Sequence, residues 1–266
     1  MTQNPFEPGA KRPSVTEGVF SREEVALANR NSGALLETLG LEITPTGTHY
    51  LLNHFDVPVL DEAAHVLSFE GAFDAPFRLT MDEIRALPEM TRPVTLECAG
   101  NGRAGVSPRC FSMPWMYEAV GTSKWTGTPL APLLERAQPH SGVQDFAFLG
   151  ADFGFDKGQP HYFGRSLTPD QIADLDVMLV WGMNGQPLLP QHGAPLRIIV
   201  PGWYGMASVK WLTTITALTE RYQGFQQVQT YRLRKNEDDP GTPVTTIRVK
   251  SLMKPPGVPD WVTRHR

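Results

Sequence analysis

The chain has 266 residues, a formal net charge of −4 at pH 7, and 24 glycines and 24 prolines. Its length can bury one large hydrophobic core, and its weakly acidic balance gives no general attraction to nucleic acid or to an anionic membrane. The longest apolar runs, such as residues 177–181, are far too short to cross a bilayer. We therefore expect an ordered, loop-rich globular protein that neither binds nucleic acid nor spans a membrane.

The first residues of the chain are polar, and they contain neither an apolar signal core nor a twin arginine. We therefore expect a cytoplasmic protein, or a periplasmic one if a signal has been removed. The only two cysteines are Cys98 and Cys110. A disulfide scaffold is not plausible for a chain of this size with so few cysteines.

Short helical and strand-like segments are predicted to alternate along the chain. Helical stretches are expected around 21–29, 34–39, 80–87 and 129–137, and after a capping box at Thr168. Strands are expected over 66–71, 94–98, 146–149, 177–183, 186–189, 196–200 and 210–218. Asn184-Gly185 between two of these runs predicts a tight β-hairpin. Strands and helices interleave irregularly, so we predict an α+β fold.

The pattern changes near residue 224, where an alternating run over 242–250 is followed by a proline-rich stretch. This change predicts the start of a second domain. We therefore divide the chain into an N-terminal extension (1–44), a main domain (45–223) and the beginning of a C-terminal domain (224–266).

The predicted strand 94–98 ends at Cys98 and leads into a glycine-rich loop. Gly100 to Gly105 matches G-x-G-x-x-G, a dinucleotide-binding pattern that requires an α-helix to begin at the loop. Pro108 and Pro114 follow closely and argue against a regular helix there.

Three other interpretations of Cys98 stay open on the residues alone. It could be a nucleophile, with a base supplied by a histidine such as His54 or His192. It could be a thiolate ligand of a soft metal, with Arg103 lowering the thiol pKa. It could also be a buried apolar side chain at the end of a strand, which is common for a single cysteine.

The sequence from Glu97 to Arg103, Glu-Cys-Ala-Gly-Asn-Gly-Arg, resembles the cofactor-cysteine loop of the sulfite oxidase family of molybdenum enzymes. Similar blocks occur in the family's order at 53–58, 124–130, 183–188, 192–197 and 201–211. The resemblance covers about 44–225. It implies a mixed α/β molybdopterin-binding fold of the sulfite oxidase type.

The resemblance also implies a molybdenum-molybdopterin cofactor, a pterin dithiolene in which Cys98 is the only protein ligand of the metal. By position, the cofactor-binding residues are Tyr50, Asn53, His54, Cys98, Asp152, His192, Arg197, Ser208, Val209 and Lys210. Arg197 and Lys210 suit phosphate as charged donors. Taken singly, His54 could instead be a satisfied core histidine, and Lys210 a solvent-facing strand residue.

Three residues are catalytic candidates on the same resemblance. Arg103 matches the second arginine after the family's cysteine and would bind an oxyanion. Tyr222 resembles the active-site tyrosine of a Tyr-x-Gly-Phe segment, and its alternative is an amphipathic surface tyrosine. Arg165 is a further candidate for the anion pocket, or merely a surface cation.

The expected reaction is a two-electron oxygen-atom transfer, with sulfite or a related small sulfur oxyanion as substrate. Leu52 and Gly102 stand where the family usually has arginines, so the pocket is less cationic. Reduction of an S- or N-oxide at the same centre is therefore a close alternative. An alternative of another class is a molybdopterin-binding protein without turnover.

Two expectations about partners complete the prediction. We expect electrons to pass to a separate acceptor, such as a cytochrome c. Residues 244–260 resemble only the first stretch of the family's immunoglobulin-like dimerisation domain, so we expect a monomer.

Overall fold

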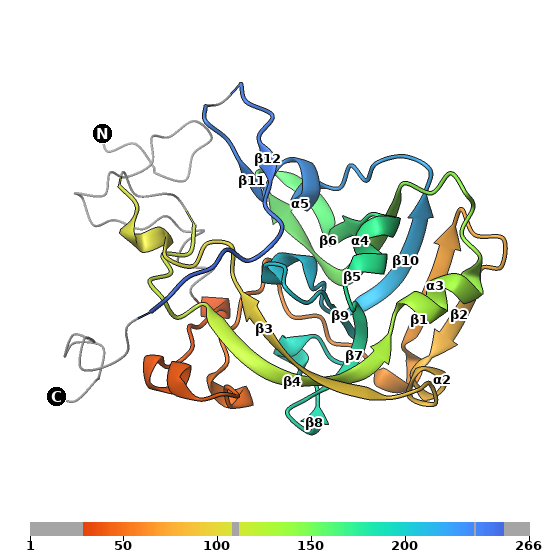
Figure 1. Ribbon diagram of the computed structural model, residues 1–266, viewed down its shortest axis with the longest axis horizontal. Helices are drawn as coiled ribbons and strands as arrows, with labels where there is room; N and C mark the ends of the chain where they lie inside the picture. Colours follow the sequence, from red (N-terminus) through yellow and green to blue (C-terminus); the bar gives the residue numbers. More distant parts are fainter. Residues whose placement is uncertain (1–28, 108–111, 237, 253–266) are drawn as a thin grey trace.

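The computed structural model of the chain describes residues 29–107, 112–236 and 238–252. Two five-stranded sheets form most of the fold, and a small hairpin stands out from them (Figure 1). Short α-helices and single 3₁₀ turns connect the strands. The mixed α+β class predicted from the sequence is confirmed. Among the described residues no helix is both long enough and apolar enough to cross a membrane.

The first sheet has the strand order β2-β1-β10-β5-β6. Its strands are β1 (Val66–Gly71), β2 (Phe77–Thr80), β10 (Leu212–Leu218), β5 (Asp145–Asp156) and β6 (Gln159–Leu167). The β1–β10 pair is parallel, and the other neighbours are antiparallel. Because β6 is an edge strand, its free side is open to the C-terminal part of the chain, where α5 (Phe225–Val228) packs against it.

The second sheet is built on the long antiparallel pair of β3 (Met90–Glu97) and β4 (Val120–Pro129), which curves along one side of the molecule (Figure 1). Its other strands are β7 (Met178–Met183), β8 (Gln186–Pro187) and β9 (Arg197–Ile199). Asn184 and Gly185 join β7 to β8 with φ angles of 53° and 76°. The predicted Asn-Gly hairpin is therefore confirmed, because this turn needs two residues with positive φ.

Both predicted capping boxes are present. Thr80 caps α2 (Met81–Arg85) and Thr168 caps α4 (Pro169–Asp174), each with its side chain accepting a hydrogen bond from the backbone N–H of the third helical residue. The helix predicted over 129–137 is observed as α3 (Ala131–Ala137). The one predicted over 34–39 is a 3₁₀ turn, η2 (Leu36–Gly40). Residues 21–28 of the first predicted stretch lie outside the described residues.

Several strands are longer than predicted, and others were not predicted. β5 extends well beyond 146–149, and β2, β4 and β6 had no counterpart among the expected segments. β4 is rich in glycine, threonine and serine, so its sequence lacks the alternation of apolar and polar residues that predicts a strand. It is held by pairing with β3 on one side and β7 on the other.

Two clusters of buried side chains form the core. The larger one joins the first sheet to the helices, and the second surrounds the fully buried Trp125 and includes Cys98. Val244 and Ile247 pack against the larger cluster. The described residues after 224 therefore contact the core of the main domain, and their assignment to a separate domain remains a prediction.

Candidate functional site

One cavity brings together residues from both sheets and from the C-terminal part of the chain. Most of the predicted cofactor-binding residues line it: Tyr50, His54, Cys98, Asp152, His192, Arg197, Ser208 and Lys210. The remaining two, Asn53 and Val209, do not line it.

Cys98 follows β3 directly and is 5% exposed. The backbone N–H of Gly100 donates to its Sγ at 3.4 Å. Burial raises the pKa of the thiol, while this hydrogen bond and the charge of Arg103 act in the opposite direction. A bound metal ion would therefore have to displace the thiol proton when it binds.

The loop after Cys98 does not open an α-helix. Only a three-residue 3₁₀ turn, η5 (Arg103–Gly105), follows it, so no helix N-terminus is available to a pyrophosphate. Gly102 has a φ of 90°, which explains why glycine stands where an arginine was expected from the resemblance. The dinucleotide interpretation therefore has no structural support.

Two cations lie in the cavity wall, the buried Arg197 and the partly buried Lys210. Arg197 donates from Nη1 to the carbonyl of His192 at 2.8 Å and from Nη2 to the carbonyl of Ser208 at 3.0 Å. Lys210 donates to the carbonyls of Leu52 at 3.0 Å and Gln191 at 3.1 Å. Burial lowers the pKa of both side chains, and for Arg197 the value is about 10.

Asn53 contributes indirectly, because its Oδ1 accepts a further hydrogen bond from the Lys210 ammonium. Val209 is a core residue, and its carbonyl accepts from the backbone N–H of Ile198 at 2.9 Å. Lys210 is thus fixed by neutral acceptors, and it is not the solvent-facing strand residue of the alternative interpretation.

The same wall holds polar atoms that have no protein partner. Asp152 Oδ1, Arg197 Nε and His49 Nε2 are buried and find no hydrogen-bond partner among the described residues. Burial raises the pKa of Asp152, and it lowers the pKa of His192 to about 3, so that imidazole is neutral near pH 7. Buried polar groups usually have partners, so these unpaired atoms are compatible with a polar ligand in the cavity.

Besides Tyr50, a second tyrosine lines the cavity: Tyr231, a residue that the sequence analysis did not consider. Its hydroxyl lies 2.5 Å from His54 Nε2, and the His54 ring is 4.7 Å from the Phe163 ring. Burial lowers the pKa of His54 to about 3, so the neutral ring can accept a hydrogen bond from the Tyr231 hydroxyl. Burial raises the pKa of Tyr231, so its hydroxyl keeps the proton that it donates in this bond.

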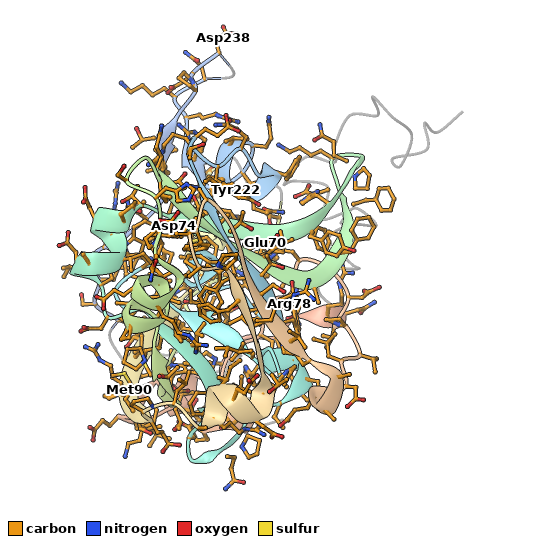
Figure 2. The ribbon with its side chains drawn as sticks, turned by 90° about the vertical axis from the view of Figure 1, so that its right-hand side faces the viewer. Glu70, Asp74, Arg78, Met90, Tyr222 and Asp238 are labelled. Atoms are coloured by element: carbon orange, nitrogen blue, oxygen red, sulfur yellow. The ribbon has the colours of Figure 1, made fainter. Side chains whose placement is uncertain are left out.

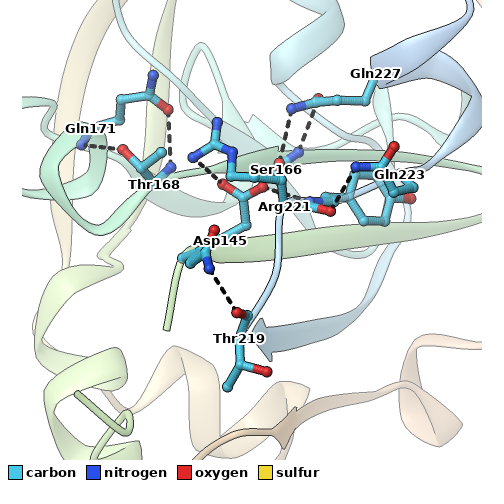
Figure 3. A network of polar contacts seen from close by, with 10 residues as sticks. Asp145, Ser166, Thr168, Gln171, Thr219, Arg221, Gln223 and Gln227 are labelled. Carbon is cyan, nitrogen blue, oxygen red and sulfur yellow. Dashed lines mark hydrogen bonds and ion pairs between the residues drawn. The ribbon is translucent and has the colours of Figure 1, made fainter. Parts of the chain in front are cut away.

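The three predicted catalytic residues lie outside the cavity lining. The backbone N–H of Tyr222 donates to Asp145 at 2.7 Å, next to the Arg221–Asp145 ion pair of 3.2 Å (Figure 3). Its hydroxyl packs on Gly164, where a Cβ atom would come within 2.4 Å. In Figure 2, Tyr222 lies toward the end of the molecule opposite to Met90, where β3 begins.

The two predicted catalytic arginines are close behind the wall. Arg165 is 3% exposed, donates to the carbonyl of Gln226, and lies with Cζ 5.6 Å from the centroid of the Tyr231 ring. Arg103 donates to the carbonyl of Met113 at 2.8 Å, and its guanidinium packs against Gly100. Arg165 is therefore not a surface cation.

The donor set suits an anionic cofactor that carries a soft metal. It combines a single thiol, two cationic side chains and several unpaired hydrogen-bonding atoms in one cavity. Thiolates prefer soft or borderline metals, and guanidinium and ammonium groups bind phosphate. Leu52 also lines the cavity, so the position at which the resemblance predicts arginine is apolar.

Comparisons with known proteins give the same assignment. Residues 54–226 match the family described as "Oxidoreductase molybdopterin binding domain". A nitrate reductase from Volvox carteri is 35% identical over 74% of this chain, and a sulfite oxidase from Arabidopsis thaliana is 32% identical over 72%. The chain spans only 24% and 51% of those two proteins.

The fold is similar to that of the sulfane dehydrogenase SoxCD from Paracoccus pantotrophus. The TM-score is 0.66 at 23% sequence identity, covering 86% of this chain and 61% of that one. The family match confirms the predicted enzyme class and the molybdenum-molybdopterin cofactor. Because this match covers more than half of the chain, the protein belongs to the oxidoreductase family with a molybdopterin-binding domain, which includes the sulfite oxidase-type molybdenum enzymes.

Proposed function

We propose that the chain catalyses a two-electron oxygen-atom transfer, with sulfite or a related small sulfur oxyanion as its substrate. One observation carries the proposal: Cys98 and the Tyr231–His54 pair line the same cavity. Arg103 and Arg165 lie close enough for their charges to lower the pKa of Tyr231, against the larger effect of burial. A small anion next to Tyr231 would be stabilised by the same two charges.

The cofactor would be held by residues already described. Cys98 would be the protein ligand of the metal, and Arg197, Lys210 and His192 would donate hydrogen bonds to phosphate or pterin oxygens. When bound, the molybdenum cofactor supplies the two-electron redox change and the exchange of the oxygen atom. The protein's own contribution is orientation, charge and the exclusion of water.

Tyr231 and His54 would act on the substrate. The Tyr231 hydroxyl can donate either to His54 Nε2 or to a substrate oxygen, and the neutral His54 ring orients the hydroxyl by accepting its hydrogen bond. Arg165 has no acidic partner among the described residues, so its charge remains available to an anion in the cavity. A catalytic role for Tyr222, expected from the resemblance, is the competing proposal, and comparison of Tyr222→Phe with Tyr231→Phe tests it.

Leu52 favours a second candidate function in the same class. An apolar side chain at this wall position removes a charge that a small dianion would need, and it suits a neutral S- or N-oxide. The similarity to nitrate reductases adds nitrate to the candidate oxidants. In this direction an external donor would supply two electrons, and the substrate would lose its oxygen atom as water after uptake of two protons.

Steady-state assays of the cofactor-loaded protein separate these functions. Sulfite-dependent reduction of ferricyanide would support the leading proposal, and oxidation of a reduced viologen by a sulfoxide, an N-oxide or nitrate would support the second. Full molybdenum content without turnover in any of these assays would leave a binding protein of the same family. For turnover in the cell, we propose a separate electron acceptor such as a cytochrome c.

A further inference from the structure

A segment near the end of the described chain runs along the back of the cavity. This C-terminal strap, residues 244–250, is bound through backbone hydrogen bonds from Tyr204 N–H to the carbonyl of Thr245 and from Ile247 N–H to the carbonyl of Gly202, both at 2.9 Å. Gly205 and Met206, which follow this contact, line the cavity. The strap is therefore anchored to the segment that forms one wall of the site.

The strap ends at an ion pair with the residue before Cys98. Lys250 Nζ lies 2.5 Å from Glu97 Oε1 and 5.6 Å from the centroid of the Tyr204 ring. The Glu97 side chain is 5% exposed, whereas that of Lys250 is 44% exposed. Among the described residues, Lys250 is the only cation within ion-pair distance of this buried carboxylate.

Glu97 in turn fixes the loop that carries the cysteine. Its Oε1 accepts a hydrogen bond from Asn101 Nδ2 at 3.1 Å, and Asn101 Oδ1 accepts one from the backbone N–H of Ala119 at 3.1 Å. The Asn101 backbone N–H donates to the carbonyl of Cys98 at 2.9 Å. The side chain of Asn101 thus spans the loop, and Glu97 orients it.

A buried carboxylate without a cation is unfavourable, and its side chain would move toward water. This movement would weaken the Glu97–Asn101 contact and loosen the loop around Cys98. The Lys250 ammonium keeps the Glu97 carboxylate in place. Lys250 lies in the strap, 153 positions after Glu97 in the sequence.

We propose that Lys250 is a positioning residue for the Cys98 loop, acting through Glu97 and Asn101. Docking of the strap would thereby favour retention of the cofactor, although the strap would not contact the cofactor. The importance of the loop for retention rests on the proposed role of Cys98 as metal ligand. The ordering of the loop does not depend on that role.

The first test is hydrogen–deuterium exchange of the peptide covering residues 98–105 in the cofactor-free full chain. Lys250→Met keeps the aliphatic stem over Tyr204 and removes the charge, and we expect the loop amides to exchange about threefold to tenfold faster. Lys250→Arg should restore protection. Lys124→Met, a change at an exposed lysine on β4, is the matched control and should leave the loop unchanged.

A double-mutant cycle shows whether the effect passes through Glu97. Gln at position 97 can still accept from Asn101 but has no charge, so Lys250→Met should have no further effect in the Glu97→Gln protein. Wild-type exchange in Lys250→Met would overturn the proposal. The proposal would also be overturned if Lys250→Met had an equal effect in the wild-type and Glu97→Gln proteins. Faster exchange spread evenly over the whole chain would overturn it as well.

The second test measures the rate at which the loaded protein releases its cofactor, which should rise in Lys250→Met and not in Lys124→Met. Equal release rates for the two variants, with faster loop exchange in Lys250→Met, would reject the link to retention. A wild-type protein that takes up no molybdenum would refute the proposed function, while the exchange data would still decide the role of Lys250.

Discussion

Replacing Tyr231 by phenylalanine tests the centre of the proposed mechanism. The change removes one oxygen atom and keeps the ring that packs beside His54 and Arg165. It leaves His54 Nε2 without its partner at 2.5 Å, in a region where burial already lowers the pKa of this histidine to about 3. An unsatisfied buried nitrogen costs about 1–3 kcal/mol.

If the hydroxyl also contacts the substrate in the transition state, the loss of that contact appears in the rate. We therefore expect kcat/KM to fall about tenfold to a hundredfold, since each 1.36 kcal/mol corresponds to a factor of about ten. Cofactor content and the far-ultraviolet circular dichroism spectrum should be unchanged, because the ring and the backbone are retained.

The assay is steady-state turnover at equal molybdenum content, with whichever substrate the wild-type protein converts. Tyr222→Phe is the matched comparison, because the Tyr222 hydroxyl packs on Gly164 outside the cavity lining, and we expect its kcat/KM to stay within about twofold of wild type. Wild-type activity in Tyr231→Phe would refute the reasoning. A loss confined to Tyr222→Phe would restore the role inferred from the Tyr-x-Gly-Phe segment.

Four further predictions test the rest of the site. Cys98→Ser should abolish turnover and leave thermal unfolding of the cofactor-free protein nearly unchanged; retained activity would remove Cys98 as ligand. Leu52→Arg adds a cation to the cavity wall and should lower the KM for sulfite about fivefold but not that for a neutral sulfoxide. The free energy of unfolding of the cofactor-free protein should decrease as the pH falls from about 6.5 toward about 3. Burial lowers the pKa of His54 and His192, so the unfolded chain binds protons at these residues before the folded chain does. Urea titrations at several pH values check this, and His192→Gln should reduce the dependence of the unfolding free energy on pH. Thr80→Ala removes the capping box of α2 and should destabilise the protein by about 1 kcal/mol without affecting turnover.

The sequence was sufficient for features that depend on neighbouring residues. The capping boxes at Thr80 and Thr168 and the Asn184-Gly185 turn are local, because each is formed by residues within four positions of one another. The resemblance to a known family located Cys98 and the cations Arg197 and Lys210, which the structure places in one cavity. Charged and thiol side chains that serve a cofactor have few substitutes, so their pattern is visible in a single chain.

The tertiary structure alone showed that Tyr231 lines the same cavity as Cys98. Tyr231 has no motif around it, and it meets His54 from 177 positions away, at a backbone φ of 43°. The Glu97–Lys250 pair likewise joins distant segments. Such contacts depend on how β6, α5 and the C-terminal strap pack together, and neither periodicity nor local propensity encodes that packing. The sequence by itself determined the cofactor class, and the packing of distant segments determined which side chains surround it.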